Sequence, residues 1–126
     1  MASVVPVQSP IVIAINRVCS MDSKQIAIEL NRLVGLKITA AIGGVTETRR
    51  ASDWAEGVPP RRLDALKAAL QAASAITTRY GDAAPRPWFM STNPRLGFRS
   101  PLAALRAAEQ PEDYDAVVSC AVQDVS

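Results

Sequence analysis

The segment 62–80 constrains the fold more than any other part of this chain, because its apolar residues recur at the spacing of a long helix. One stripe of side chains, three and four residues apart, can face a core: Leu63, Leu66, Leu70, Ala73, Thr77 and Tyr80. A second stripe consists of alanines: Ala65, Ala68, Ala69, Ala72 and Ala75. Alanine side chains are short, so another helix can approach this stripe closely. We therefore expect residues 62–80 to form the central helix of the protein.

Capping residues and glycines delimit shorter helices before the central one. Asp22 and Gln25 have the spacing of a capping box, and Gly35 is placed to end the helix that they begin. Two further short helices are expected at residues 36–42 and 46–56, on either side of a glycine turn. The first half of the chain is therefore predicted to be helical.

Other segments complete the expected architecture. Residues 11–19 fit a helix or a strand, because periodicity cannot separate the two in so short an apolar run, and we predict a helix. After a loop at residues 81–87, rich in glycine, proline and aspartate, helices are expected at residues 101–108 and 111–123. No strand pattern of convincing length follows residue 20. The sequence therefore predicts an all-α fold.

Charge is distributed unevenly along the chain. The formal net charge is +2, yet residues 79–106 hold five arginines and one aspartate, whereas residues 107–126 hold five acidic residues and no lysine or arginine. The loop after Tyr80 predicts a boundary between an N-terminal module, residues 1–80, and a C-terminal module, residues 81–126. The charge pattern indicates two surfaces for different partners, although a solvated acidic helix also explains the last segment.

The sequence contains no histidine, which bears on both catalysis and metal binding. Histidine is the usual general base near neutral pH, and the acidic residues form no catalytic constellation. Cys19 and Cys120 lie far apart without a CxxC motif, so we expect two buried thiols rather than a metal site. We therefore expect no enzymatic activity, no cofactor and no metal.

Neither a membrane span nor a secretory leader is expected. The longest apolar run, residues 4–15, is interrupted by Pro6 and Pro10 and is too short for a bilayer. The first basic residue is Arg17, whereas a leader has basic residues before its apolar stretch. We therefore expect a cytoplasmic protein. The run 4–15 and the alanine stripe together exceed what so small a core can cover, which predicts a homodimer or larger homo-oligomer.

Two short predicted helices meet at a glycine turn in residues 36–61, which read LKITAAIGGVTETRRASDWAEGVPPR. This segment resembles a helix-turn-helix of the Xre type, whose second helix presents its first turns to the major groove of DNA. Ala51 and Trp54 would anchor that second helix, so the helix-turn-helix is expected at residues 36–57. The expected DNA contacts are Thr48, Arg49, Arg50 and Ser52. Nearby acidic residues oppose phosphate approach, so a helical pair without DNA binding is the second interpretation.

A second motif occupies residues 88–105, which read WFMSTNPRLGFRSPLAAL. It combines an aromatic pair, an Asn-Pro turn, a Leu-Gly step, a basic residue and a Ser-Pro helix start. This order resembles the toxin-binding domain of the MbcA/ParS/Xre antitoxin family, and with the helix-turn-helix the resemblance covers residues 36–123. Phe98 departs from the pattern, because the family usually has a second glycine or an acidic residue there. By residue type, three side chains of the motif are expected in the core: Trp88, Leu96 and Leu105.

The resemblance implies an antitoxin of a type II toxin-antitoxin system. Its partner would be a RES-domain toxin, an NAD-consuming enzyme, held inactive by a C-terminal module whose last residues block the entrance to the active site. The N-terminal module would bind operator DNA and repress the protein's own promoter. The acidic C-terminal segment fits this expectation, because a pocket for the NAD pyrophosphate must be basic. The expected toxin contacts are Asn93, Arg99, Glu112, Asp115, Gln123, Asp124, Val125 and Ser126.

A different class of function is the alternative. A stand-alone DNA-binding repressor of the phage or mobile-element type would use the C-terminal module only for dimerisation. Toxin binding without DNA binding is a third hypothesis. A RES-domain gene next to this one would favour the antitoxin, and its absence would favour the repressor.

Overall fold

The computed structural model of the chain describes residues 9–126 and confirms the all-α prediction, since 72% of the chain is helical and no strand lies in this range. In chain order the elements are α1 (Pro10–Cys19), α2 (Ser23–Val34), α3 (Leu36–Ile42), α4 (Arg49–Ala55), α5 (Leu63–Tyr80), α6 (Pro85–Met90), the 3-10 helix η1 (Pro94–Leu96), α7 (Pro101–Ala107) and α8 (Pro111–Val125). None of the helices within the described range is long and apolar enough to cross a membrane.

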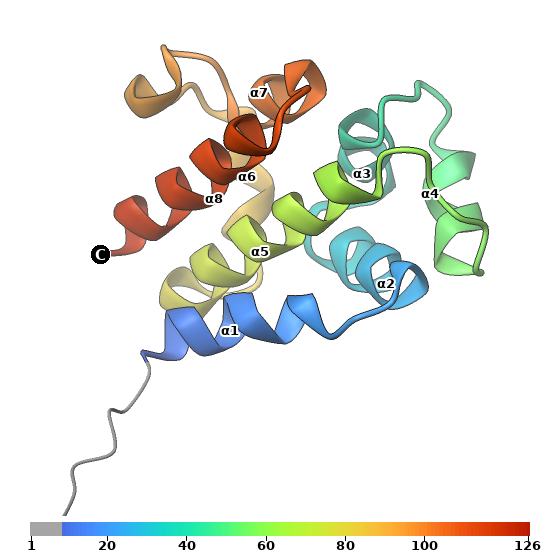
Figure 1. The fold of residues 1–126 in the computed structure, drawn as a ribbon, viewed down its shortest axis with the longest axis horizontal. Helices are drawn as coiled ribbons and strands as arrows, with labels where there is room; N and C mark the ends of the chain where they lie inside the picture. The colour runs from blue at the N-terminus through green and yellow to red at the C-terminus, as the bar shows by residue number, and fades with distance from the viewer. Residues whose placement is uncertain (1–8) are drawn as a thin grey trace, which may run out of the picture.

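Helix α5 is the centre of the molecule. Figure 1 shows α5 running through the middle, with α1 along one side and α8 along the other, and both helices pack on it. All five alanines of the predicted alanine stripe are at most 5% exposed. The other stripe is buried at Leu66, Leu70 and Ala73, but Tyr80 at its end is exposed, contrary to prediction. Because other parts of the same chain cover these alanines, the alanine stripe does not require a second copy of the chain to bury it.

The first two helices begin at the residues that the sequence indicates. In α1, which confirms the predicted helix, the Ser9 hydroxyl accepts a hydrogen bond from the Val12 amide at 3.2 Å. In α2 the capping box is formed: the Gln25 amide donates to Asp22 Oδ1 at 2.8 Å, and the Asp22 amide donates to Gln25 Oε1 at 3.1 Å. Such caps satisfy amides that have no partner inside the helix. The sequence therefore determines both starts locally.

The apolar face of α1 is only partly covered. Val18 is buried, whereas Val12 and Ile13 are exposed. Cys19 is also exposed, so the prediction of two buried thiols is wrong for Cys19 and right for Cys120. The remainder of the apolar run, residues 4–8, lies outside the described residues.

Three predicted boundaries differ from the structure. Helix α4 begins at Arg49 rather than at residue 46, and its first amide bonds run from Arg50 to the Glu47 carbonyl and from Ala51 to the Thr48 carbonyl. Helix α6 lies partly inside the predicted loop 81–87, where Pro85 occupies the first helical position, a place that proline favours. Helix α8 continues to Val125, since that side chain is buried against the core.

A single hydrophobic core includes residues from both sides of the boundary predicted after Tyr80. Leu30 and Leu66 before it, and Leu105 and Val117 after it, are fully buried in the same cluster. Leu96 is also buried, as expected. Trp88 is only half-buried, and its neighbour Phe89 takes the core position instead, with the two rings edge to face at 5.0 Å between centroids.

One arginine links the ends of two helices across this core. Arg62, which precedes α5, donates through Nη2 to the carbonyl oxygens of Leu105 at 2.9 Å and Ala108 at 2.8 Å. Its Nη1 donates to the carbonyl oxygens of Ile42 at 3.3 Å and Arg106 at 3.2 Å. Carbonyls at a helix C-terminus lack partners inside the helix and carry partial negative charge. Arg62 therefore caps α3 and α7 together.

Candidate functional site

The turn between α3 and α4 has a geometry that requires glycine. The Gly44 amide donates to the Ala41 carbonyl at 3.1 Å, and the Val45 amide donates to the Ala40 carbonyl at 3.0 Å. These two bonds form a Schellman cap, in which the residue at Gly44 has a positive φ, here 83°. A residue with a side chain is strained in this conformation. The glycine turn expected from the sequence is therefore present and ends α3 abruptly.

The position of α4 is fixed from both sides. Trp54 and Ala51 are buried as expected, and the Asn31 side-chain amide on α2 donates to the Ala51 carbonyl at 2.9 Å. Gly43 lies directly against the indole ring: a Cβ added at Gly43 would be only 2.3 Å from Trp54 Cη2. The first turn of α4 is therefore held at a defined angle to α3.

The residues predicted to contact DNA lie together at the start of α4. Thr48, Arg49 and Arg50 are exposed, whereas Ser52 is half-buried. Arg50 forms only a long, exposed ion pair with Glu47, at 4.0 Å. Sequence reasoning missed Arg61, which lines a shallow depression together with Arg50. Arg49, Arg50 and Arg61 are named here the α4 basic surface.

A second group of residues gathers at the C-terminal end of α8. We name it the Asp124 cluster, and it comprises Tyr80, Trp88, Asn93, Arg95 and Asp124. The Asp124 carboxylate accepts hydrogen bonds from Trp88 Nε1 at 2.8 Å, Asn93 Nδ2 at 2.9 Å and Arg95 Nη1 at 2.5 Å. The Tyr80 hydroxyl donates to the Asp124 carbonyl at 3.4 Å. Three side chains of the motif 88–105 are therefore hydrogen-bonded to one carboxylate.

This arrangement changes the interpretation of Asp124. The sequence analysis placed Asp124 among the toxin contacts of the acidic C-terminal segment, and in the structure its side chain is 21% exposed and has three donors within the chain. Hydrogen bonds to a charged group contribute about 1.5–3 kcal/mol each when well formed, and the exposed arginine contributes less. Asp124 therefore holds three side chains of the motif 88–105 in place.

The neighbouring thiol has no reactive character. Cys120 is buried one helical turn before Asp124, with its Sγ 3.9 Å from Asp124 Oδ2. Burial, with the nearby carboxylate, raises the pKa of the Cys120 thiol to about 11. Because the thiolate is the nucleophile, Cys120 is protonated and unreactive near neutral pH.

A tight turn extends from the Asp124 cluster. The Asn93 amide donates to the Arg99 carbonyl at 3.0 Å, the Phe98 amide donates to the Asn93 carbonyl at 2.9 Å, and the Arg99 amide donates to the Leu96 carbonyl at 3.3 Å. Both central residues have positive φ, 65° at Gly97 and 64° at Phe98, as in a type I′ turn. The predicted toxin contacts Asn93 and Arg99 therefore lie in one turn, with Asn93 buried and Arg99 exposed.

The backbone at Phe98 is strained. A side chain in the left-handed region costs roughly 1–2 kcal/mol relative to glycine, and a bulky residue there is an outlier. Phe98 gains no burial in return, because it is 71% exposed. The turn at Gly97 and Phe98 therefore forms with phenylalanine in its second central position.

The surface around the Asp124 cluster has the composition of a protein-binding site. Tyr80 is 60% exposed, the Arg95 side chain is 51% exposed, and Trp88 is half-buried. Tyrosine, tryptophan and arginine dominate the energetics of protein interfaces, above all where their conformations are already fixed. Hydrogen bonds to Asp124 hold all three of these side chains. The side chains of the cluster are therefore pre-organised.

The other predicted toxin contacts are placed differently. Glu112 and Asp115 are exposed on the first turns of α8, roughly 18 Å and roughly 14 Å from Asp124 along the helix axis at about 1.5 Å per residue. Gln123 and Ser126 are exposed in the last turn, but Val125 is buried in the core. The predicted set therefore divides into a group near Asp124 and an acidic pair at the other end of α8.

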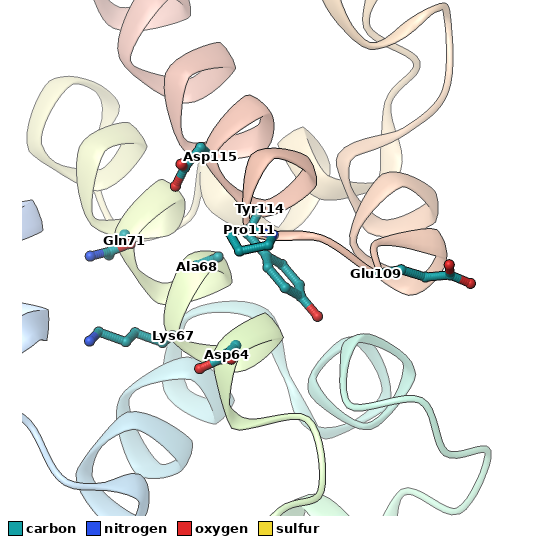
Figure 2. A pocket seen from close by; sticks show the side chains of 8 residues that line it. All are labelled: Asp64, Lys67, Ala68, Gln71, Glu109, Pro111, Tyr114 and Asp115. Carbon is teal, nitrogen blue, oxygen red and sulfur yellow. The ribbon is translucent and has the colours of Figure 1, made fainter.

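A groove of about 270 Å³ lies between α5 and the start of α8 (Figure 2). Its lining residues are Asp64, Lys67, Ala68, Gln71, Glu109, Pro111, Tyr114 and Asp115. In Figure 2 the Tyr114 ring projects beside α5, whereas Glu109 points away from the other charged side chains. No ion pair joins the charged groups of the groove, and residues 9–126 contain no cluster of three potential metal ligands. The groove thus offers no convergent set of groups for chemistry.

The two candidate surfaces lie far apart. In Figure 1, α4 is at one end of the long axis of the molecule, and the C-terminal end of α8 is at the other. The α4 basic surface and the Asp124 cluster are therefore two separate surfaces.

Comparison of the chain with models of protein families, with curated proteins and with solved structures finds no match. The functional assignment therefore depends on the residues of these two surfaces.

Proposed function

We propose that this chain is an antitoxin, a protein without catalytic activity that neutralises a RES-domain toxin by binding it. The observation that carries the proposal is the Asp124 cluster. The motif that resembles a toxin-binding domain forms one pre-organised surface, in which Trp88, Asn93 and Arg95 share a single carboxylate. Inhibition by such a surface is steric, and it requires no group that reacts.

The acidic pair on α8 supports a second part of the same interface. Glu112 and Asp115 are exposed and lie three positions apart, so both project from neighbouring positions of the helix. Carboxylates on a rim attract a basic partner surface, and they mainly increase the rate of association. In this proposal the Asp124 cluster provides affinity, and the acidic pair directs the approach to a basic NAD pocket.

The α4 basic surface supports operator binding as a second role. Arg49 and Arg50 lie at the start of a helix whose angle to α3 is fixed by Trp54 and Gly43. Guanidinium groups bind phosphates and guanine edges, and short helices joined by a tight turn present such groups to the major groove. The same observation favours the alternative function, a repressor that acts without a toxin.

Co-expression with the RES-domain toxin of the adjacent gene tests the proposal. The wild-type chain should restore growth of cells that express the toxin, and it should form a stable complex with a catalytically inactive form of the toxin. The control is Arg49→Ala with Arg50→Ala, which should restore growth equally well but lose salt-dependent binding to promoter DNA. If the wild-type chain binds promoter DNA and neither restores growth nor binds the toxin, the repressor is the correct function.

A further inference from the structure

We propose that Phe98 is the anchor through which this chain binds its partner protein, and that it inserts into an apolar pocket surrounded by acidic residues. The inference rests on the proposed function, because it assigns the partner-binding role to one residue of the same surface. It also concerns the position at which this chain departs from the family pattern.

The first reason is that the backbone of Phe98 is strained while its side chain gains little burial in return. Among residues 9–126, it is the one residue other than glycine with a positive φ. Its ring is 71% exposed, more than any other large hydrophobic side chain in this part of the protein. Glycine at this position would relieve the strain and lose no burial. Strained residues of this kind concentrate at functional sites, where a partner provides the compensation.

The second reason is that hydrogen bonds hold the backbone of the turn that carries the ring in a fixed place. The Phe98 amide donates to the Asn93 carbonyl at 2.9 Å, and Asn93 is itself bound through its side chain to Asp124 at 2.9 Å. Asn93 Oδ1 also accepts a hydrogen bond from the Arg95 amide at 3.0 Å. An aromatic ring on a rigid turn loses little conformational entropy on binding. Phe98 is therefore suited to be an anchor side chain.

The third reason, the charge around the ring, indicates the chemistry of the partner. Arg99 follows Phe98 directly, its Nε donates to the Leu96 carbonyl at 3.1 Å, and it forms no ion pair with any residue from 9 to 126. The guanidinium is thus held beside the turn, and its charge is only partly offset by Asp113, which lines the same depression but forms no direct ion pair with it. An apolar pocket with carboxylates on its rim complements this arrangement of ring and cation.

The test measures stability and binding in the same variants. Phe98→Gly removes both the ring and the strain, so its melting temperature should rise by roughly 4 °C or more. Its Kd for the catalytically inactive RES-domain toxin should increase at least about tenfold, as expected for an anchor residue. Phe98→Tyr should retain most of the binding, because it keeps the ring. Ile28→Ala is the matched control, since it removes an exposed apolar side chain from α2 and should change neither quantity.

Each contrary outcome has a separate meaning. If Phe98→Gly binds the toxin within about twofold of the wild type, the anchor inference is wrong and the antitoxin proposal stands. If the wild-type chain does not bind the toxin, both the anchor inference and the antitoxin proposal are wrong. If the wild type binds a fluorescent oligothymidine and Phe98→Gly does not, the ring stacks on nucleic acid bases instead, which overturns the protein-partner inference. A lower melting temperature for Phe98→Gly would refute the strain argument.

Discussion

Replacing Arg62 by alanine removes the cap that α3 and α7 share. The two shorter hydrogen bonds, to the Leu105 and Ala108 carbonyls, connect a charged donor to helix-end carbonyls in a half-buried place. Bonds to charged groups contribute about 1.5–3 kcal/mol each, so the loss of these two amounts to about 3 kcal/mol at the low end. The loss of about 3 kcal/mol does not include the two longer hydrogen bonds, to the Ile42 and Arg106 carbonyls.

The expected change in melting temperature follows from the length of the chain. For 126 residues, the entropy of unfolding is about 0.26 kcal/mol/K, so a loss of about 3 kcal/mol lowers the melting temperature by roughly 11 °C. Arg62→Lys should give an intermediate loss, because one ammonium group cannot reach the carbonyls of both helices as the planar guanidinium does.

Thermal unfolding followed by far-ultraviolet circular dichroism measures these changes. The matched control is Arg61→Ala, because Arg61 is exposed, is adjacent in sequence, and forms no hydrogen bond or ion pair through its side chain with residues 9–126. Its melting temperature should stay close to that of the wild type. If Arg62→Ala melts within about 2 °C of Arg61→Ala, the shared cap does not stabilise the fold and the reasoning from its geometry is wrong.

Two further predictions concern local contacts. Gly43→Ala should destabilise the protein by about 1–3 kcal/mol, because the new Cβ overlaps the Trp54 ring, and Trp54→Leu in the same chain should recover part of this loss. If urea denaturation shows that the free-energy losses of the two single substitutions simply add, the overlap of the new Cβ with the Trp54 ring does not cause the loss of stability in Gly43→Ala. Asp113 accepts amide bonds from Glu109 and Gln110, which lower the pKa of its carboxyl below the ordinary value of 3.8. Since the charged form is favoured in the folded state, this stabilisation is present above the unfolded pKa and is lost as pH falls through the folded pKa. Asp113→Asn should therefore be less stable than the wild type at pH 7, and the difference in the free energy of unfolding should shrink below about pH 4. A difference that is equal at pH 7 and below about pH 4 would contradict the role of the Asp113 carboxylate as a helix cap.

Local patterns in the sequence predicted the elements that depend on local interactions. The capping box at Asp22 and Gln25, the Ser100-Pro101 helix start and the buried alanine stripe are all confirmed. Each is a relation between residues a few positions apart, which a single sequence displays directly. Helix type and most helix boundaries follow from such relations.

The contacts between distant segments could not be predicted in this way. Asp124 binds Trp88, Asn93 and Arg95, which are 29 to 36 positions away in the sequence. Nothing in its local sequence distinguishes Asp124 from a solvated acid at the end of a helix. Arg62 has the same property, because its carbonyl partners are 20 to 46 positions away, and backbone carbonyls have no sequence signature.

The central position of α5 has a consequence for the order in which the chain is made. Helices α1 and α2 precede α5, so one flank can be covered as soon as Tyr80 has been synthesised. The other flank is covered by α8, which begins at Pro111 and ends at Val125. At about 5–20 residues per second, the ribosome needs roughly 2–9 s to proceed from Tyr80 to Val125. During these seconds the flank of α5 that α8 covers in the folded chain lacks this helix, and apolar surface exposed in this way promotes aggregation.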